Sequence, residues 1–200
     1  MGGLGITRRR LVGVGAAGAL GVLLAPDAVL ADSENRGEVE LLRWDLVQIV
    51  QGVVLAGGTD VARDAASGDL ISLTGSGGAR PEKHKGTGGG TFVHKHANSS
   101  EVAHGVYVVT GFNSFVNAGG SLVGTGLTDG IDSLNKTTGG VLSLRVHLMA
   151  SSGLTADGVL EVNCDLPGSS KPITEGVRLS VLTFKFVQNS GATLFHILED

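Results

Sequence analysis

Three histidines lie close together in a segment that predicts two neighbouring strands. His94 and His96 stand one residue apart, and His104 follows on the next apolar segment. Residues 91–96 and 102–110 are typical of two arms of a hairpin joined by residues 97–101. If this loop has an odd number of residues, His94 lies opposite His104, with His96 one diagonal step away on the same face. An even-length loop places His104 on the other face.

Three converging imidazoles would suit a transition metal. Three protein ligands with one open position are the catalytic arrangement of zinc, and bound zinc lowers the pKa of its water to about 7. The segment thus predicts a metal-dependent hydrolase or lyase in which His94, His96 and His104 hold the ion, with His84 or Glu101 as proton carriers. The competing interpretation, solvated or hydrogen-bonded histidines, is favoured because no H-E-x-x-H motif is present. We therefore expect no cofactor, with zinc as the alternative.

Four further groups of residues have weaker chemical signals. Cys164 is the single cysteine, so no intrachain disulfide can form, and we expect a buried, inert thiol beside Asp165. Arg145 and His147 lie on the outward face of an apolar strand and could bind an anion, although an ordinary polar sheet face is favoured. His196, in the apolar terminal strand, is expected to be hydrogen-bonded in the core or at its rim. Asp129 and Asp132, near Asn135 in a long loop, miss the spacing of a calcium-binding loop.

The elements that would position these residues are strands. Apolar and polar residues alternate in several segments, most clearly from Val141 to Ala150, and turn residues separate them. No helical segments recur between them, which favours an antiparallel barrel or sandwich of about eight or nine strands, with a slight preference for the barrel because closure removes exposed edges. Residues 59–69 are ambiguous, and residues 77–90 and 117–140 are expected to be loops. The predicted strands cover residues 41–50, 70–76, 91–96, 102–110, 112–116, 141–150, 159–166, 177–187 and 193–198.

The composition limits the class of partner. A hydrophobic content of 42% can form a core, while 33 glycines and an aromatic content of 4% indicate many tight turns. Without the first 31 residues, which contain Arg8, Arg9, Arg10 and Asp27, the totals of 15 basic and 19 acidic residues fall to 12 and 18. A domain with a net charge of −6 lacks the basic surface that nucleic acids and anionic membranes require.

The amino-terminal segment resembles a twin-arginine signal peptide. Arg8 and Arg9 precede an apolar run from Leu11 to Ala25, and Val29-Leu30-Ala31 is a small-residue cleavage pattern. We expect export by the twin-arginine machinery, cleavage after Ala31 and no stable membrane anchor afterwards, which places the protein outside the cytoplasm. An uncleaved anchor is the alternative. The expected organisation is a signal peptide at 1–31, a polar linker at 32–40 and a single β domain at 41–200.

Short motifs in the mature chain resemble those of a set of small exported bacterial proteins of uncharacterised function. The resemblance would cover most of the domain and implies an extracytoplasmic location and a β architecture. It carries no catalytic residues. The motifs are Trp44-Asp45, Gly88-Gly89-Gly90-Thr91, the segment Gly105 to Gly111, the segment Val162 to Pro167, Glu175-Gly176 and the segment Thr193 to His196.

Three functions follow from these observations. The leading expectation is an exported domain that is not an enzyme and that binds a small molecule or a partner through a barrel mouth or a sheet face. The second is the metal-dependent enzyme built on His94, His96 and His104. The third is a structural module of the cell surface, which requires no site.

Overall fold

The computed structural model of the protein describes residues 41–198. The expected signal peptide with Arg8, Arg9 and Ala31, and the linker at 32–40, therefore lie outside the described residues. Within 41–198 the all-β class is confirmed, and the strands number thirteen, more than the predicted eight or nine. They are β1 (Leu41–Val50), β2 (Val53–Ala56), β3 (Asp60–Asp64), β4 (Leu70–Leu73), β5 (Ser76–Arg80), β6 (Lys85–Lys95), β7 (Glu101–Gly119), β8 (Thr128–Asp129), β9 (Thr137–Ala150), β10 (Thr155–Cys164), β11 (Gly176–Val181), β12 (Phe184–Ser190) and β13 (Ala192–Leu198).

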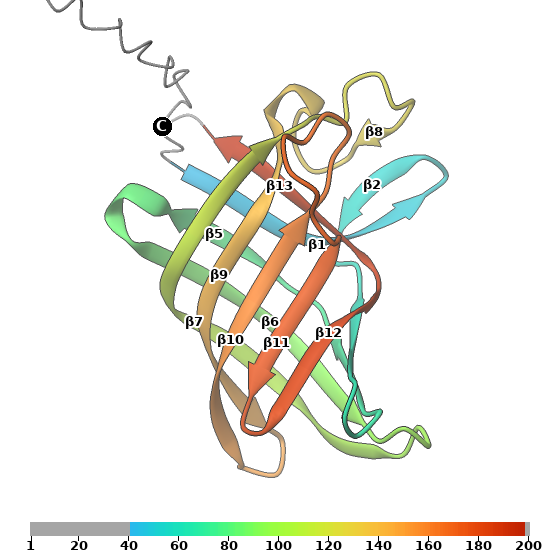
Figure 1. Cartoon of the computed structure of the whole chain (residues 1–200), viewed down its shortest axis with the longest axis vertical. Helices are drawn as coiled ribbons and strands as arrows, with labels where there is room; N and C mark the ends of the chain where they lie inside the picture. The colour runs from blue at the N-terminus through green and yellow to red at the C-terminus, as the bar shows by residue number, and fades with distance from the viewer. Residues whose placement is uncertain (1–40, 199–200) are drawn as a thin grey trace, which may run out of the picture. The chain divides into compact units, whose positions relative to one another are not determined.

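The strand pairings form a circuit. From β3 they run through β4, β6, β7, β9, β10, β11 and β12, which pairs with β3 again. β5, β1 and β13 form a second connection from β6 to β9. Every pairing is antiparallel except that of β2 with β8. In Figure 1 the second half of β7 and β9 to β12 run side by side at the front, and β6 passes behind them.

The two ends of this circuit differ in their loops. The lower end in Figure 1 is formed where β6 and β11 finish and where β10 and β12 begin. The upper end has β2, β8 and the long segment 120–136, which contains η2 (Leu134–Lys136). "Lower end" and "upper end" are used below in this sense.

Side-chain alternation explains why the strands bury one face. In β9 Leu142, Leu144 and Val146 are buried whereas Arg145 is exposed, as a period of two requires. Trp44 of β1 is fully buried in the core. No helix among residues 41–198 has the length and apolar character needed to cross a membrane.

The segment 77–90, expected to be a loop, forms β5, the short helix η1 (Pro81–Lys83) and the first half of β6. Its glycines are needed for close packing rather than for turns. A Cβ on Gly77 would lie 2.7 Å from the indole nitrogen of Trp44, and one on Gly88 would lie 2.9 Å from its ring. The glycines therefore make room for the largest core side chain.

Other expected boundaries also change. Residues 177–187 form a hairpin of β11 and β12 instead of one strand, because Leu182 takes a positive φ of 53° at the turn. The ambiguous segment 59–69 contains β3, and the expected loop 117–140 contains β8 and η2.

Candidate functional site

The three histidines of the hairpin do not converge. His94 lies opposite Ala103, and Val93 lies opposite His104, so His104 projects from the other face of the sheet. Its Nδ1 is 2.6 Å from Oε1 of Glu101, and both side chains are about half exposed. The register with His94 opposite His104 is thus wrong, and the alternative register is the one observed. Among the described residues no group of three His, Cys, Asp or Glu side chains could hold a metal ion.

His94 and His96 instead share a carboxylate. Nε2 of His94 is 3.0 Å from Oδ2 of Asp69, and Nδ1 of His96 is 3.2 Å from the same oxygen. Asp69 directly precedes β4, which pairs with β6 and so brings the carboxylate to the histidines. The backbone N–H of Asp69 donates a hydrogen bond to the hydroxyl oxygen of Ser67 at 3.2 Å. The lower end therefore has a buried acid with two imidazole partners.

Asp69 is ionised in this arrangement. Burial by itself would raise the pKa of Asp69, but the hydrogen bonds from His94 and His96 outweigh it and hold the pKa below its ordinary value. An ionised carboxylate can only accept hydrogen bonds. Nε2 of His94 and Nδ1 of His96 must therefore carry the protons, which fixes the tautomer of each neutral ring.

Beside His94 the lower end encloses a cavity of about 260 Å³. Small side chains on three strands, Ala103, Ala150 and Ala156, leave this space open, and larger apolar side chains bound it. His94 is only 12% exposed, whereas His96 is 56% exposed. We call this space the lower cavity. Its lining is Ile71, Phe92, His94, His96, Val102, Ala103, Leu148, Ala150, Ser152, Leu154, Thr155, Ala156, Val181, Leu182, Phe184 and Phe186.

Two phenylalanines fix the His94 ring. The ring centroids of Phe184 and Phe186 lie 5.0 and 5.4 Å from that of His94, both in edge-to-face geometry. The two phenyl rings are stacked on each other at 5.4 Å. Such contacts add about 0.5–1.5 kcal/mol each beyond area burial. His94 is thus held by a carboxylate on one side and by aromatic rings on the other.

The second nitrogen of His94 has no protein partner. Among the described residues no hydrogen bond reaches its Nδ1, and this atom is not sealed from solvent. In the neutral ring Nδ1 carries a lone pair, because Nε2 holds the proton. His94, which lines the lower cavity, therefore has a ring nitrogen that no described residue uses.

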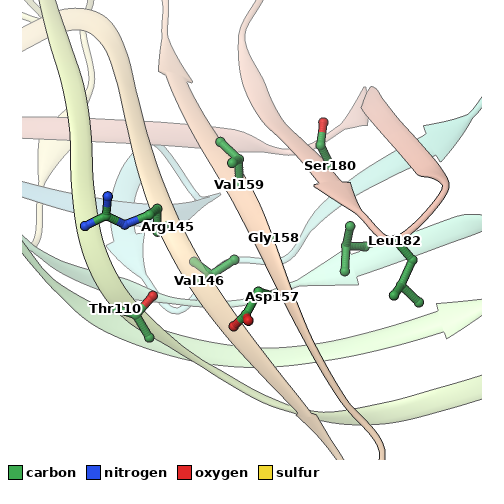
Figure 2. A pocket seen from close by; sticks show the side chains of 9 residues that line it. Thr110, Arg145, Val146, Asp157, Gly158, Val159, Ser180 and Leu182 are labelled. Atoms are coloured by element: carbon green, nitrogen blue, oxygen red, sulfur yellow. The ribbon is translucent and has the colours of Figure 1, made fainter.

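A second hollow lies on the outer face of β9 to β11, and Figure 2 shows its lining. It has a volume of about 610 Å³ but is open and shallow, with Arg145, Asp157 and Ser180 around it. Asp157 is held by Nδ1 of His147 at 2.8 Å. His147 is thus paired with an acid on this face, and binding of an anion by Arg145 and His147 stays the less favoured alternative to an ordinary polar sheet face.

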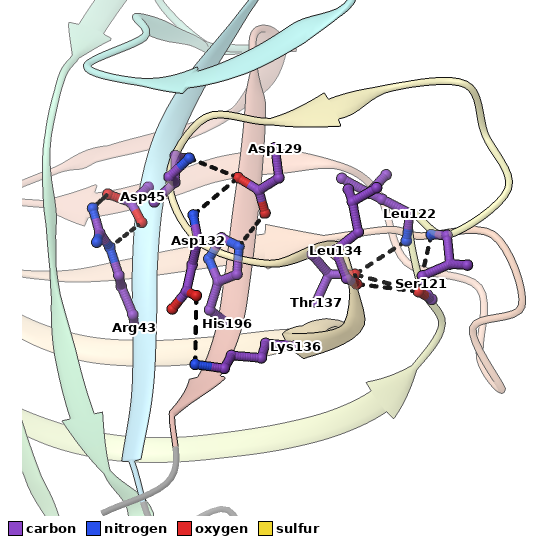
Figure 3. Close-up of polar contacts among 12 residues, drawn as sticks. Arg43, Asp45, Ser121, Leu122, Asp129, Asp132, Leu134, Lys136, Thr137 and His196 are labelled. Carbon is purple, nitrogen blue, oxygen red and sulfur yellow. Dashed lines mark hydrogen bonds and ion pairs between the residues drawn. The ribbon is translucent and has the colours of Figure 1, made fainter.

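The upper end contains a second histidine–aspartate pair (Figure 3). Nε2 of His196 is 2.6 Å from Oδ2 of Asp129, and both side chains are essentially buried. Oδ1 of Asp129 also accepts from the backbone N–H groups of Ile131 and Asp132. His196 is thus a hydrogen-bonded core histidine, as expected, and this pair ties the segment 120–136 to β13.

The remaining buried groups at the upper end are not placed for chemistry. The thiol of Cys164 donates to the carbonyl of Thr193 at 3.4 Å and is buried, as expected, and burial raises the pKa of Cys164 far above its ordinary value. Glu175 accepts hydrogen bonds from the backbone N–H groups of Asp165 and Thr193. Neither carboxylate oxygen of buried Asp60 has a hydrogen-bond partner among residues 41–198.

The functional residues that sequence reasoning missed are Asp69, Phe184 and Phe186. Asp69 reaches the histidines only through the pairing of β4 with β6, and both phenylalanines come from β12 across the circuit. No family model matches the chain, and no curated protein or solved structure matches it either. The resemblance to small exported proteins stays a prediction.

Proposed function

We propose that the protein binds a small, largely apolar molecule in the lower cavity. One observation carries this proposal: a largely apolar cavity is lined by His94, whose ring a carboxylate and two phenylalanines hold in one orientation. Ligand pockets are typically apolar with a few positioned polar groups. The eight-strand circuit is best described as a barrel, and the lower cavity is then its mouth.

The size of the cavity limits the ligand. An engineered apolar cavity of roughly 150 Å³ accepts benzene, so a volume of about 260 Å³ fits a molecule of roughly ten non-hydrogen atoms. The outer hollow is less suitable, because an open surface removes little of a small ligand from water. A compact bicyclic compound is the right scale.

The amino-terminal segment supports a location for this activity. We propose that Arg8 and Arg9 direct the chain to the twin-arginine machinery and that the domain acts outside the cytoplasm after cleavage at Ala31. The ligand would then be an extracellular or periplasmic compound. The mature net charge of −6 argues against nucleic acid as the partner.

Binding of naphthalene to the domain tests the proposal. We expect saturable binding in equilibrium dialysis, and at least tenfold weaker binding in Ala156→Leu, which fills the lower cavity. Ser180→Leu adds the same side chain on the outer face and should leave binding unchanged. Absence of naphthalene binding, or equal binding by both variants, would overturn the proposal. Thermal unfolding of each variant shows that the fold is intact.

A further inference from the structure

We infer that the natural ligand of the lower cavity is an apolar compound bearing a hydroxyl group, which donates a hydrogen bond to Nδ1 of His94. This inference rests on the proposed function and names the class of its ligand. It follows from three properties of the cavity: the identity of its acceptor, the charge beside that acceptor and the rigidity of the ring that carries it.

The acceptor is defined by the proton on the opposite nitrogen. Asp69 is ionised, so Nε2–H of His94 is the donor in the 3.0 Å contact between them. In the neutral ring Nδ1 then presents a lone pair, and the only hydrogen bond of the His94 side chain within residues 41–198 is the one through Nε2. An apolar molecule that covered this atom without a donor would leave it unsatisfied, at a cost of about 1–3 kcal/mol. A ligand hydroxyl removes this cost.

The charge of the site excludes a carboxylate as the preferred group. Of the described lining residues none is lysine or arginine, and ionised Asp69 lies directly behind His94. A ligand carboxylate placed at Nδ1 would be repelled by the lone pair of this nitrogen and by the negative charge of Asp69, in a region of low dielectric. A neutral donor avoids both effects.

The rigidity of His94 turns this acceptor into a selective one. Asp69 holds one edge of the ring, and Phe184 and Phe186 pack at 5.0 and 5.4 Å from it. The ring therefore cannot turn away when a ligand lacks the hydroxyl. Sites built to bond a ligand hydroxyl reject analogues without it more strongly than apolar pockets reject an extra methylene.

The matched probes are 1-naphthol and 1-methylnaphthalene, which have nearly the same shape because a methyl group in the second replaces the hydroxyl group of the first. We expect the full domain at neutral pH to bind 1-naphthol at least tenfold more tightly than 1-methylnaphthalene. In His94→Phe this preference should disappear while 1-methylnaphthalene still binds. His94→Leu serves the same purpose if the phenyl ring blocks the cavity or impairs folding.

The outcomes separate the two proposals. If 1-methylnaphthalene binds but 1-naphthol binds no more tightly, or if the preference survives in both His94 variants, the hydroxyl inference is overturned and the apolar site stands. If neither probe binds the native protein, the proposed function itself fails. A preference for 1-naphthoate over 1-naphthol would also overturn the inference, because it would show that the site favours an anion.

Discussion

The two ends of the circuit each contain a histidine–aspartate pair, and the pairs differ in what surrounds them. His196 and Asp129 are sealed under the segment 120–136, with side-chain exposures of 0% and 1%. His94 and Asp69 border the lower cavity, with exposures of 12% and 7%. The same two side chains can therefore fasten a loop at one end and present an acceptor at the other.

The two pairs differ most clearly at Nδ1, the histidine nitrogen that does not contact the aspartate. Nδ1 of His196 is buried and has no partner within the described residues, so no ligand can use it unless the covering segment moves. Nδ1 of His94 also has no hydrogen-bond partner within the described residues, but it is not sealed from solvent, and His94 lines the lower cavity. Solvent accessibility of the second ring nitrogen, rather than the pair itself, therefore distinguishes the two ends.

The largest expected effect is on the sealed pair. Asp129→Ala leaves His196 buried without a partner and frees the backbone N–H groups of Ile131 and Asp132. We expect a loss of about 3–5 kcal/mol in the free energy of unfolding, measured with denaturant. Asp132→Ala, which removes only the partly exposed pair with Lys136, is the control and should cost under about 1 kcal/mol. Equal losses would show that the pair does not fasten the segment.

Acidification should weaken the same pair. The hydrogen bond from His196 and the two backbone donors outweigh the effect of burial and hold the pKa of Asp129 below its ordinary value. A lowered carboxyl pKa stabilises the fold above the unfolded value, about 3.9, and this stability is lost as the pH falls through the folded value. Denaturant midpoints below pH 4 should therefore fall less in Asp129→Ala than in the native protein.

An acid without a histidine partner should behave in the opposite way. Burial, with a contribution from the charge of Glu175, raises the pKa of Asp60 from 3.8 to about 7. The folded state then keeps a proton that the unfolded state has lost, so stability falls as the pH rises from about 4 through 7. We expect Asp60→Asn to remove this fall and to stabilise the domain by about 2 kcal/mol at pH 8. A native stability that is flat between pH 5 and 8 would contradict this expectation.

The features that could be predicted from the sequence are those set by local patterns. The alternation of Leu142, Leu144 and Val146 identifies β9 and its buried face, and the lone cysteine is expected to be buried. The pairing of Asp69 with His94 could not be predicted in this way, because it depends on β4 lying beside β6. The glycines of residues 77–90 hid the first half of β6, since they allow close packing against neighbouring backbone and, at Gly77 and Gly88, against Trp44.

The register of the β6–β7 hairpin also could not be predicted from the local sequence pattern. Residues 95–101 form a compact turn in which Ser99 has a positive φ of 70° and the N–H of His96 bonds the carbonyl of Ser100. A register shift then lies between His94 and Lys95. One such irregularity exchanges the two faces of a strand, so residue spacing could not decide whether His104 joins His94.

At the cavity end, Asp69→Asn should change binding more than stability. An amide oxygen can still accept from Nε2–H of His94, but the charge that fixes the ring is lost. We expect the preference for 1-naphthol over 1-methylnaphthalene to fall about threefold to tenfold, with a stability loss near 1 kcal/mol. Calorimetric titration with both probes measures the first effect. A loss as large as that of Asp129→Ala would mean that both pairs are mainly structural.

The smallest effect on stability and binding is expected from a change at His104. This change also tests the hypothesis that His94, His96 and His104 bind zinc. Its contact with Glu101 joins two half-exposed side chains, and such surface pairs contribute about 0–1 kcal/mol. His104→Ala should therefore leave stability, probe binding and the metal content of the purified domain unchanged. If elemental analysis instead finds about one equivalent of zinc that this variant loses, His104 must join His94 and His96 around an ion. The hairpin register would then have to change, and the acceptor role of His94 would be replaced by metal ligation.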